Sequence, residues 1–424
     1  KKIKMCGFSG IFSLSKISDA HKRKMHEMTS EIKHRGPDFT DYFSDEFFSV
    51  GFNRLSIIDI KGGSQPMISE NKKYLICFNG EIYNHKSLRK NLINKGKKFK
   101  SSSDTEVFLE YFSNYGMNCI EKMRGMFSVV IYDIENKKIF LIRDRLGIKP
   151  LYYSIKEDYI IFSSEISPLY KSNLIKIEPN YQAISSYLSF RYNYGVGGYI
   201  RSINTLKPGN FFEFSLNSKS EKEYWTIPTF LRIDQQKLDE EKIIEKLDKI
   251  LNESIEDHIV SDVPVGSLLS GGLDSSIITT LMKDKVKGDF NSFSAKFDET
   301  GYDESNYAKQ IANKIGITHH DLELKADEYE KKIINYINLK KTPLSIPHEI
   351  ALFSLFEKIK KKTKVVLSGE GADEIFGGYG RVQSSAFDYK KKNILNSIFS
   401  NDRSKNISQF FIDRYNWMSF GQKE

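Results

Sequence analysis

The sequence predicts a protein of two parts, an α+β part of layered sheets followed by a parallel α/β part, from three observations. The first half carries short aromatic and β-branched runs separated by turn residues, which is typical of strands. After Trp225 strand-like and helix-like segments alternate, as they do in parallel sheets. Two of the later strand-like segments end in loops rich in glycine and serine. We therefore place a domain boundary near Trp225, between residues 1–225 and 226–424.

In the first half, the predicted strands are residues 47–52, 74–78, 127–132, 139–142 and 159–162. Amphipathic segments at 88–94 and 105–114 predict helices between them. In the second half, residues 239–254 predict a helix, the polar segment after Ile227 predicts a linker, and residues 293–297 predict a core strand. His319 and His320 are adjacent, so their side chains point apart on any regular element and do not suggest a shared metal.

Composition indicates a globular protein, since 39% of the residues are hydrophobic and 28% are charged. The length of 424 residues indicates about two or three domains. No apolar run could span a bilayer, and the first residues lack the apolar core of a signal peptide. The three cysteines (Cys6, Cys77 and Cys119) show no metal or disulfide spacing, which favours a reducing, cytoplasmic setting. The lysines behind the net charge of +9 are mostly scattered, so we expect neither a nucleic-acid nor a membrane partner.

A strand, a loop and a helix are predicted in succession within residues 263–282. The apolar run at 263–269 is consistent with a buried strand, and apolar residues recur at helical spacing from Ser275 to Met282. Between them Ser270-Gly271-Gly272 can turn sharply. A loop of this kind at a helix N-terminus presents unpaired backbone N–H groups that bind phosphate. The loop lacks a Walker A ending, and a tight turn without a ligand is the alternative.

A second loop has the same build. Residues 364–367 predict a buried strand that leads into Ser368-Gly369-Glu370-Gly371-Ala372-Asp373-Glu374. Ligands of open parallel sheets bind at the carboxyl ends of the strands, so we expect both loops to face one crevice. For Glu370 or Asp373 taken alone, a solvated loop carboxylate is the alternative.

The chemistry of the first half starts at Met5-Cys6-Gly7, where removal of Met5 as an initiator methionine would give Cys6 a free α-amino group. That group, with a pKa of about 8, could activate the thiol, although Cys6 taken alone is an ordinary small hydrophobe. The motifs that follow in order are His34-Arg35-Gly36-Pro37-Asp38, Arg54-Leu55-Ser56-Ile57-Ile58-Asp59, Gln65-Pro66-Met67, Phe78-Asn79-Gly80-Glu81-Ile82-Tyr83-Asn84, Ser103-Asp104-Thr105-Glu106, Arg124-Gly125-Met126-Phe127 and Arg143-Asp144-Arg145-Leu146-Gly147-Ile148-Lys149-Pro150-Leu151.

Together with the Ser270 loop, these motifs resemble the glutamine-hydrolysing asparagine synthetases. The first part resembles a class II glutamine amidotransferase domain, which implies an Ntn-hydrolase-type αββα sandwich. The second part resembles the N-type ATP pyrophosphatases, which implies a Rossmann-like parallel α/β adenine-nucleotide (PP-loop) domain. The resemblance covers nearly the whole chain.

The resemblance implies a role for each matching residue of the first part. Cys6 would attack the glutamine side-chain amide and form a thioester, with Asn79 and the Gly80 N–H as oxyanion hole. Arg54 would hold the glutamine carboxylate, and Glu81 and Asp104 its α-ammonium group. Judged from the residues alone, Arg54 as a surface ion pair, Asp104 as a helix N-cap and Asn79-Gly80 as a hairpin turn remain open.

For the second part the resemblance implies ATP and Mg²⁺ as cofactors. Asp274 and Asp373 would serve the metal and the pyrophosphate, and Glu370 would act as a base on the attacking ammonia. The implied ATP-binding residues are Leu268, Ser270, Gly271, Gly272, Asp274, Ser275, Ala295, Ser368, Gly369 and Asp373. Ammonia would cross an enclosed, largely apolar passage to β-aspartyl-AMP, so that glutamine, aspartate and ATP give asparagine, glutamate, AMP and pyrophosphate. A homodimer is compatible with this scheme.

Three departures from the family pattern accompany the resemblance. Residues 1–4 precede Met5, and Phe52-Asn53 stands where the family commonly has His-Arg. We also expect the chain to be C-terminally incomplete, since the family carries further helices, with a phosphate-contacting lysine, beyond the position of Glu424. Two alternatives stay open. One is an amidotransferase of the same architecture acting on another carboxylate, such as a sugar acid in surface-polysaccharide synthesis. The other is a non-catalytic scaffold homologue.

Overall fold

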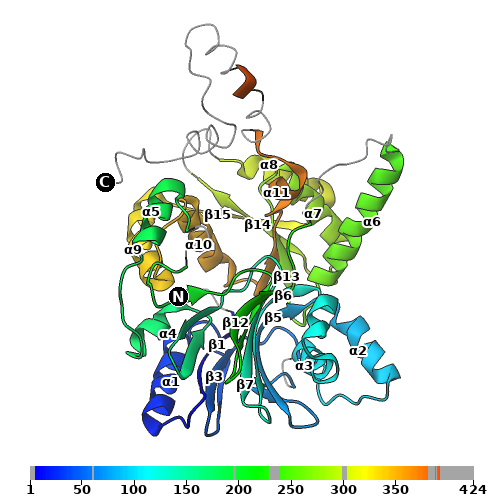
Figure 1. The fold of residues 1–424 in the computed structure, drawn as a ribbon. Coiled ribbons are helices and arrows are strands. Elements are labelled where there is room, and N and C mark those ends of the chain that lie inside the picture. The colour runs from blue at the N-terminus through cyan, green and yellow to red at the C-terminus, as the bar shows by residue number, and fades with distance from the viewer. Residues whose placement is uncertain are drawn as a thin grey trace.

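The computed structural model describes residues 5–59, 62–193, 197–228, 239–297, 303–380, 387 and 389–391 (Figure 1). Strands between Gly7 and Glu223 form two antiparallel sheets, and strands between Val265 and Leu367 form one parallel sheet. This arrangement confirms the predicted fold class. The linker expected after Ile227 falls mainly on residues 229–238, which lie outside the described residues.

The first antiparallel sheet has the strand order β10-β8-β9-β1-β3-β2. Its strands are β1 (Gly7–Ser13), β2 (Phe39–Ser44), β3 (Phe48–Arg54), β8 (Tyr152–Ile155), β9 (Tyr159–Ser163) and β10 (Asn204–Thr205). The second sheet has the order β12-β11-β7-β6-β5-β4. Its strands are β4 (Met67–Ile68), β5 (Tyr74–Ile82), β6 (Gly125–Asp133), β7 (Lys138–Arg143), β11 (Asn210–Phe214) and β12 (Lys219–Glu223).

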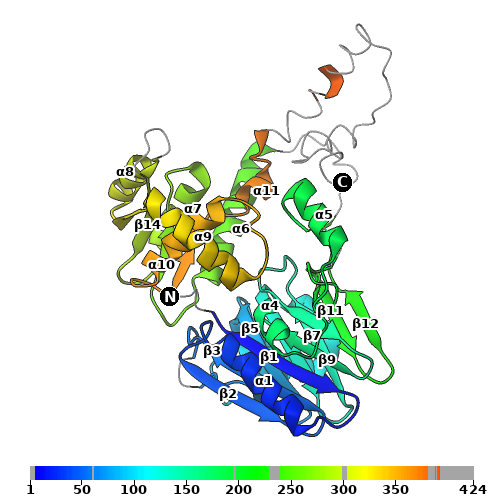
Figure 2. The ribbon, with the colours of Figure 1, turned by 90° about the vertical axis from the view of Figure 1, so that its left-hand side faces the viewer.

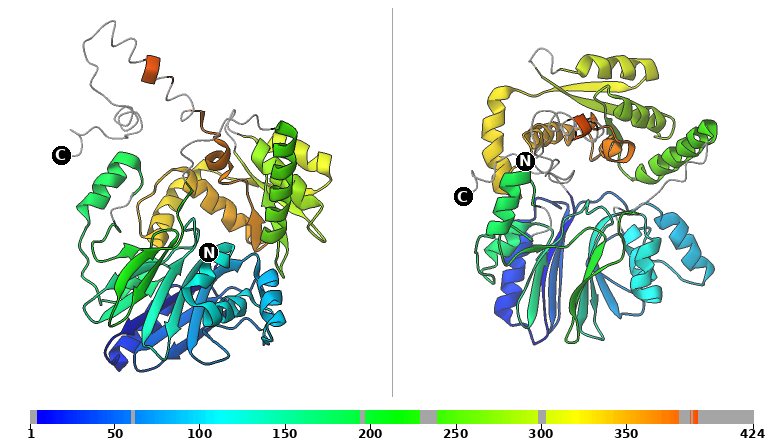
Figure 3. Two further views of the ribbon diagram at one scale, coloured as in Figure 1. Left: turned by 45° about the vertical axis from the view of Figure 1, so that its right-hand side comes forward. Right: turned by 45° about the horizontal axis from the view of Figure 1, so that its top comes forward.

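The two antiparallel sheets stack face to face, with helices on both outer faces (Figure 3). Alternate residues of each strand point to opposite faces. Phe12 and Phe48 therefore meet Tyr132 in a core between the sheets. On the outside, α1 (Asp19–Glu31) and α4 (Ile166–Lys171) cover the first sheet. The second sheet is covered by α2 (His85–Asn94), α3 (Asp104–Tyr115) and a 3₁₀ helix, η1 (Gly116–Lys122).

The parallel sheet lies beside this sandwich and has the order β15-β14-β13-β16 (Figures 1 and 2). Its strands are β13 (Val265–Leu268), β14 (Asn291–Lys296), β15 (Thr318–Glu323) and β16 (Val365–Leu367). The remaining helices are α5 (Tyr181–Phe190), α6 (Glu240–His258), α7 (Leu273–Lys283), α8 (Ser305–Ile315), α9 (Ala326–Lys340), α10 (His348–Ile359) and α11 (Ala372–Phe376). One face of the sheet packs against α6 and α7, and the other packs against α10.

One expectation about this sheet is wrong. The strand before Ser368 was expected to be buried, but all three residues of β16 are only half-buried. The reason is its position, because β16 is the edge strand of the described sheet while β13 lies inside it. Among the described residues, we find no helix with the length and apolar character needed to cross a bilayer.

The aromatic contact between Phe48 and Tyr132 provides a test of the sandwich core. Phe48 is fully buried, and its ring stacks on that of Tyr132 with 4.5 Å between centroids. We expect Phe48→Ala to lower the free energy of unfolding of the sandwich by about 3–5 kcal/mol, because it removes buried area and leaves a cavity. Urea denaturation followed by circular dichroism measures this change.

The matched control is Leu216→Ala, since Leu216 is 80% exposed. This variant should stay within about 0.5 kcal/mol of the wild type. Equal effects of the two substitutions would contradict the packing described for the core.

Candidate functional site

Six residues predicted from the first half line one small cavity of about 60 Å³, which we call the thiol pocket. Different elements bring them there, because Cys6 directly precedes β1, Arg54 ends β3 and Asp104 begins α3. The other three, Asn79, Gly80 and Glu81, lie within β5. The pocket thus draws on both antiparallel sheets and on a helix that packs against one of them.

The Cys6 thiol lies against the residue that follows β3. Its Sγ donates to the Leu55 carbonyl oxygen at 3.4 Å, and the Leu55 N–H donates to Sγ at 3.3 Å. Burial raises the pKa of the Cys6 thiol, although the Leu55 backbone and the cationic Lys149, Arg35 and Arg54 oppose this rise. A protonated thiol is a weak nucleophile, so reaction here requires a base within reach of Cys6.

The pocket position of Arg54 excludes the alternative of a surface ion pair. Its side chain is almost fully buried, with 7% of the residue exposed. One guanidinium nitrogen, Nη2, donates to the carbonyl oxygens of Ile58 and Asp59 at 3.3 and 2.5 Å. These contacts fix the orientation of a planar donor group that suits a carboxylate ligand.

Asn79 and Gly80 do not form a hairpin turn, because they sit inside β5 opposite Ser128 and Phe127 of β6. A Cβ atom added at Gly80 would lie 2.1 Å from the Met126 carbonyl oxygen. Glycine is therefore required at this point by the close approach of the neighbouring strand. The Asn79 side chain is buried, and its Nδ2 donates to Ser128 Oγ at 3.4 Å.

The helix-cap alternative for Asp104 is also wrong. The N-cap of α3 is Ser103, whose Oγ accepts from the Glu106 N–H, whereas Asp104 Oδ2 accepts from the Ile82 N–H at 2.9 Å. Burial raises the pKa of the Asp104 carboxyl, against this hydrogen bond. Burial also raises the pKa of Glu81 to about 7, with Lys149 opposing the rise and Asp104 adding to it. Two desolvated carboxyls and one buried guanidinium in the same pocket complement an α-amino acid, which carries both charges.

Lys149, to which the sequence motifs assigned no role, also lines the thiol pocket. The loop that presents it is organised by the buried Asp144, whose carboxylate accepts from the N–H groups of Leu146, Ile148 and Lys149. Burial lowers the pKa of the Lys149 ammonium group, while Glu81 opposes this change. Lys149 belongs to the motif at residues 143–151, which could have marked it as a site residue. The motif alone, however, does not show which of its side chains lines the thiol pocket.

A second predicted cluster lines a cleft of about 240 Å³ at the carboxyl ends of β13 and β16, which we call the loop cleft. The predicted residues that line it are Leu268, Ser270, Gly272, Asp274, Ser275, Ser368, Gly369, Glu370 and Asp373. The two loops approach each other closely, because a Cβ atom at Gly369 would lie 3.0 Å from the Ser275 nitrogen. The expectation that both loops face one crevice is therefore confirmed for these residues.

The Ser270 loop is held by its own hydroxyl groups. Ser270 Oγ and Ser275 Oγ lie 3.0 Å apart, and the Gly272 N–H donates to Ser270 Oγ. Gly271 has φ +90°, which favours glycine, and a Cβ atom there would meet Tyr307 at 2.5 Å. No side chain caps the N-terminus of α7, so its first backbone N–H groups can serve an anionic ligand.

The loop cleft offers carboxylates that could bind Mg²⁺ together with a phosphate ligand. Among the described residues there is no cluster of three or more His, Cys, Asp or Glu side chains suited to a metal. Asp274 and Asp373 nevertheless line the same cleft. Mg²⁺ is usually held by one or two carboxylates together with substrate phosphates, so this donor set fits it.

Two of the predicted ATP-binding residues lie outside the lining of the cleft. Ala295 packs with Phe293 and Leu355 between β14 and α10. Gly271 turns toward Tyr307 on α8. Their contact with a nucleotide stays a prediction. Conversely, Glu374 and Tyr379 line the cleft without having been predicted, and their side chains are joined by a 2.6 Å hydrogen bond.

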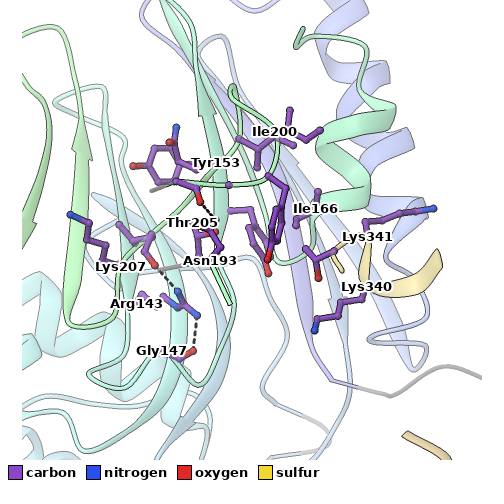
Figure 4. Close-up of a pocket in the computed structure, with 18 of the residues that line it drawn as sticks. Arg143, Gly147, Tyr153, Ile166, Asn193, Ile200, Thr205, Lys207, Lys340 and Lys341 are labelled. Carbon is purple, nitrogen blue, oxygen red and sulfur yellow. Dashed lines mark hydrogen bonds between the residues drawn. The ribbon is translucent and has the colours of Figure 1, made fainter. Parts of the chain in front are cut away.

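A third cavity, of about 500 Å³, lies elsewhere between the two parts of the chain (Figure 4). Lys340 and Lys341 lie on its α9 side, and Arg143 and Lys207 lie on the sandwich side. The Arg143 guanidinium is engaged by the carbonyl oxygens of Gly147, Lys149 and Leu206. The described lining contains none of the predicted site residues and many tyrosine and lysine side chains, so this cavity does not test the expected apolar passage, which stays a prediction.

Comparison with known proteins agrees with this two-site arrangement. Residues 5–225 match the glutamine amidotransferase domain family, and residues 246–422 match the asparagine synthase family. Asparagine synthetase [glutamine-hydrolyzing] 1 of Bacillus subtilis is 35% identical over 88% of this chain and 59% of its own length. Asparagine synthetase B [glutamine-hydrolyzing] of Escherichia coli is 29% identical over 88% of this chain and 65% of its own length.

The chain thus spans about three fifths of the length of these two curated relatives. A third relative is shorter. Putative asparagine synthetase [glutamine-hydrolyzing] 2 of Methanocaldococcus jannaschii is 32% identical over 88% of this chain and 76% of its own length. With both matched regions in order, the chain belongs to the family of glutamine-hydrolysing asparagine synthetases.

Proposed function

We propose that this protein makes asparagine, with glutamine as its nitrogen source and ATP as its energy source. In this proposal residues 1–225 form the glutaminase domain and residues 226–424 form the synthetase domain. The observation that carries it is that one chain holds a thiol pocket suited to an α-amino acid and a separate cleft formed by two glycine- and serine-rich loops.

In the thiol pocket, glutamine would bind by its carboxylate to Arg54 and by its α-ammonium group to Glu81 and Asp104. Cys6 would attack the side-chain amide, and Asn79 and the Gly80 N–H would stabilise the oxyanion. Cleavage of the peptide bond between Met5 and Cys6 would free an α-amino group next to the thiol, and this group would be the base that the buried thiol needs. Water would then hydrolyse the thioester and release glutamate.

In the loop cleft, ATP would bind with its adenosine end near Leu268, Ser368 and Gly369 and its phosphates at the Ser270 loop. Aspartate would attack ATP to form β-aspartyl-AMP and pyrophosphate, since a free carboxylate is a poor acylating agent. Asp274 and Asp373 would hold Mg²⁺, which neutralises phosphate charge when bound. Glu370 would take a proton from ammonia as it displaces AMP and yields asparagine.

The acceptor carboxylate is the least constrained element of this proposal. An amidotransferase of the same architecture acting on a sugar acid would share every residue named so far. We favour aspartate because three relatives that match 88% of the chain, and so both of its halves, carry the name asparagine synthetase. Isotope exchange between pyrophosphate and ATP separates aspartate from a sugar acid as the acceptor.

Replacement of the thiol should separate the two activities. We expect Cys6→Ala to reduce glutamate release from glutamine by roughly a thousandfold or more, because the nucleophile is lost. Amidation supported by added ammonium salt should persist, since it bypasses the thiol. Cys119→Ala is the control, because Cys119 is buried in η1 outside the pocket. Glutaminase activity retained by Cys6→Ala would exclude the proposed nucleophile.

The loop cleft can be tested by isotope exchange between pyrophosphate and ATP. We expect exchange with aspartate but not with malonate or a uronic acid, and we expect Asp274→Asn to reduce it roughly tenfold to a hundredfold by removing a charged ligand. Asp284→Asn, at the C-terminal end of the same helix α7, is the matched control. Exchange that requires a uronic acid would support the sugar-acid alternative, and no exchange with any acid would favour a non-catalytic scaffold.

The raised pKa of Glu81 predicts a pH dependence for glutamine. Below pH 7 the carboxyl is protonated and binds an ammonium group poorly, whereas above pH 7 it is charged. The KM for glutamine should therefore fall as pH rises, by up to roughly tenfold between pH 6 and pH 8. Glu81→Gln should raise the KM and flatten this profile, while the exposed Glu135→Gln should not. A wild-type KM that does not change between pH 6 and pH 8 would rule out Glu81 as a ligand of the α-ammonium group of glutamine.

A further inference from the structure

The segment Ser56–Asp59 forms one rim of the thiol pocket, and we call it the lip. Ile57 and Ile58 line the pocket directly. The carbonyl oxygens of Ile58 and Asp59 are the acceptors that orient the Arg54 guanidinium. The position of the lip therefore determines where the donors of Arg54 point.

Asp59 is the residue that organises the lip. Its φ of +49° places it in the left-handed region, which is uncommon for a residue with a side chain. The Asp59 carboxylate accepts from the N–H groups of Gly62 and Ser102 at 2.8 and 2.7 Å. Although partial burial opposes it, these hydrogen bonds and the nearby Arg54 lower the pKa of Asp59. The Asp59 carboxylate is thus bound to two N–H groups, and its carbonyl oxygen is bound to Arg54. Its own backbone N–H is bound by a partner in a different segment of the chain.

That partner comes from the other half of the chain. Asp262, which precedes β13, accepts the Asp59 N–H on Oδ2 at 2.8 Å, and its own N–H donates to the Ile57 carbonyl at 3.1 Å. Lys364, which precedes β16, donates to the Ser56 carbonyl at 3.4 Å and lies 3.6 Å from Asp38 Oδ2. Asp38 Oδ2 in turn accepts from the Ser56 N–H. Two separate segments thus hold the lip from outside the sandwich.

We infer that Asp262 and Lys364 are positioning residues of the thiol pocket, supplied in cis by the second half of the chain. They act on glutamine through the lip and Arg54, without touching the substrate. The inference rests on the proposed function, since it takes glutamine as the ligand of Arg54. It assigns to the second half of the chain a part in glutamine recognition that is separate from nucleotide chemistry.

The test compares the kinetics of variants of this 424-residue chain. Asp262→Ala removes the acceptor of the Asp59 N–H and should raise the KM for glutamine about threefold to tenfold, the range of one lost hydrogen bond. The value of kcat should stay within about twofold, because Cys6 keeps both contacts with Leu55. Asp262→Asn retains an acceptor oxygen and should restore the KM. Lys364→Met, which removes a more exposed contact, should have a smaller effect.

Arg124→Ala is the matched control, because it removes the 2.9 Å ion pair with Asp257, another contact between the two halves that does not reach the pocket. Its KM should equal that of the wild type. Equal KM values for Asp262→Ala and the wild type, or an equal rise in Arg124→Ala, would overturn the inference while leaving the proposed function intact. A wild-type protein that releases no glutamate from glutamine would overturn both.

Discussion

The parallel pairing of β13 with β16 is the constraint on which the arrangement of both sites depends. Val265 pairs with Val365, and Ser267 pairs with Leu367. Because the two strands run in the same direction, their carboxyl ends bring the Ser270 and Ser368 loops into one cleft. Their amino ends bring Asp262 and Lys364 to the lip of the other pocket. Lys364 and Ser368 are four residues apart, which at about 3.3 Å per residue is a span of at most about 13 Å.

The two sites differ in burial, and the difference matches the chemistry proposed for each. Arg54, Asn79 and Asp104 are buried, and burial raises the pKa of the Asp104 carboxyl because the charged form loses its hydration. In the loop cleft, by contrast, Glu370 and Asp373 are exposed. A triphosphate and a hydrated cation need such access, because Mg²⁺ keeps several of its waters when it binds.

Most of the site could be predicted because its residues lie in short motifs with local consequences. Gly271 illustrates this, since the sharp turn expected at Ser270-Gly271-Gly272 is present there with a φ of +90°. What the sequence could not provide were contacts between distant segments. Lys149 reaches the pocket of Cys6 from the loop between β7 and β8, with its Nζ 3.7 Å from Met5 Sδ. Asp262 meets Asp59 across 203 residues of sequence. The partial burial of β16 was missed for the same reason, because apolar content does not reveal which strand of a sheet lies at its edge.

The charges around Cys6 also bear on the fate of the nitrogen that the proposed reaction releases. Arg35, Arg54 and Lys149 are the cationic groups that act on the thiol. Arg54 would hold the glutamine carboxylate, and Arg35 pairs with Glu165 at 3.0 Å. Lys149 is therefore the cation that would disfavour protonation of ammonia beside the thiol, because two like charges close together destabilise each other. The pocket carboxyls Glu81 and Asp104 would not cancel this effect while they hold the α-ammonium group of glutamine. The pocket would therefore favour release of neutral NH₃, which is the form that can attack an acyl-adenylate, over NH₄⁺.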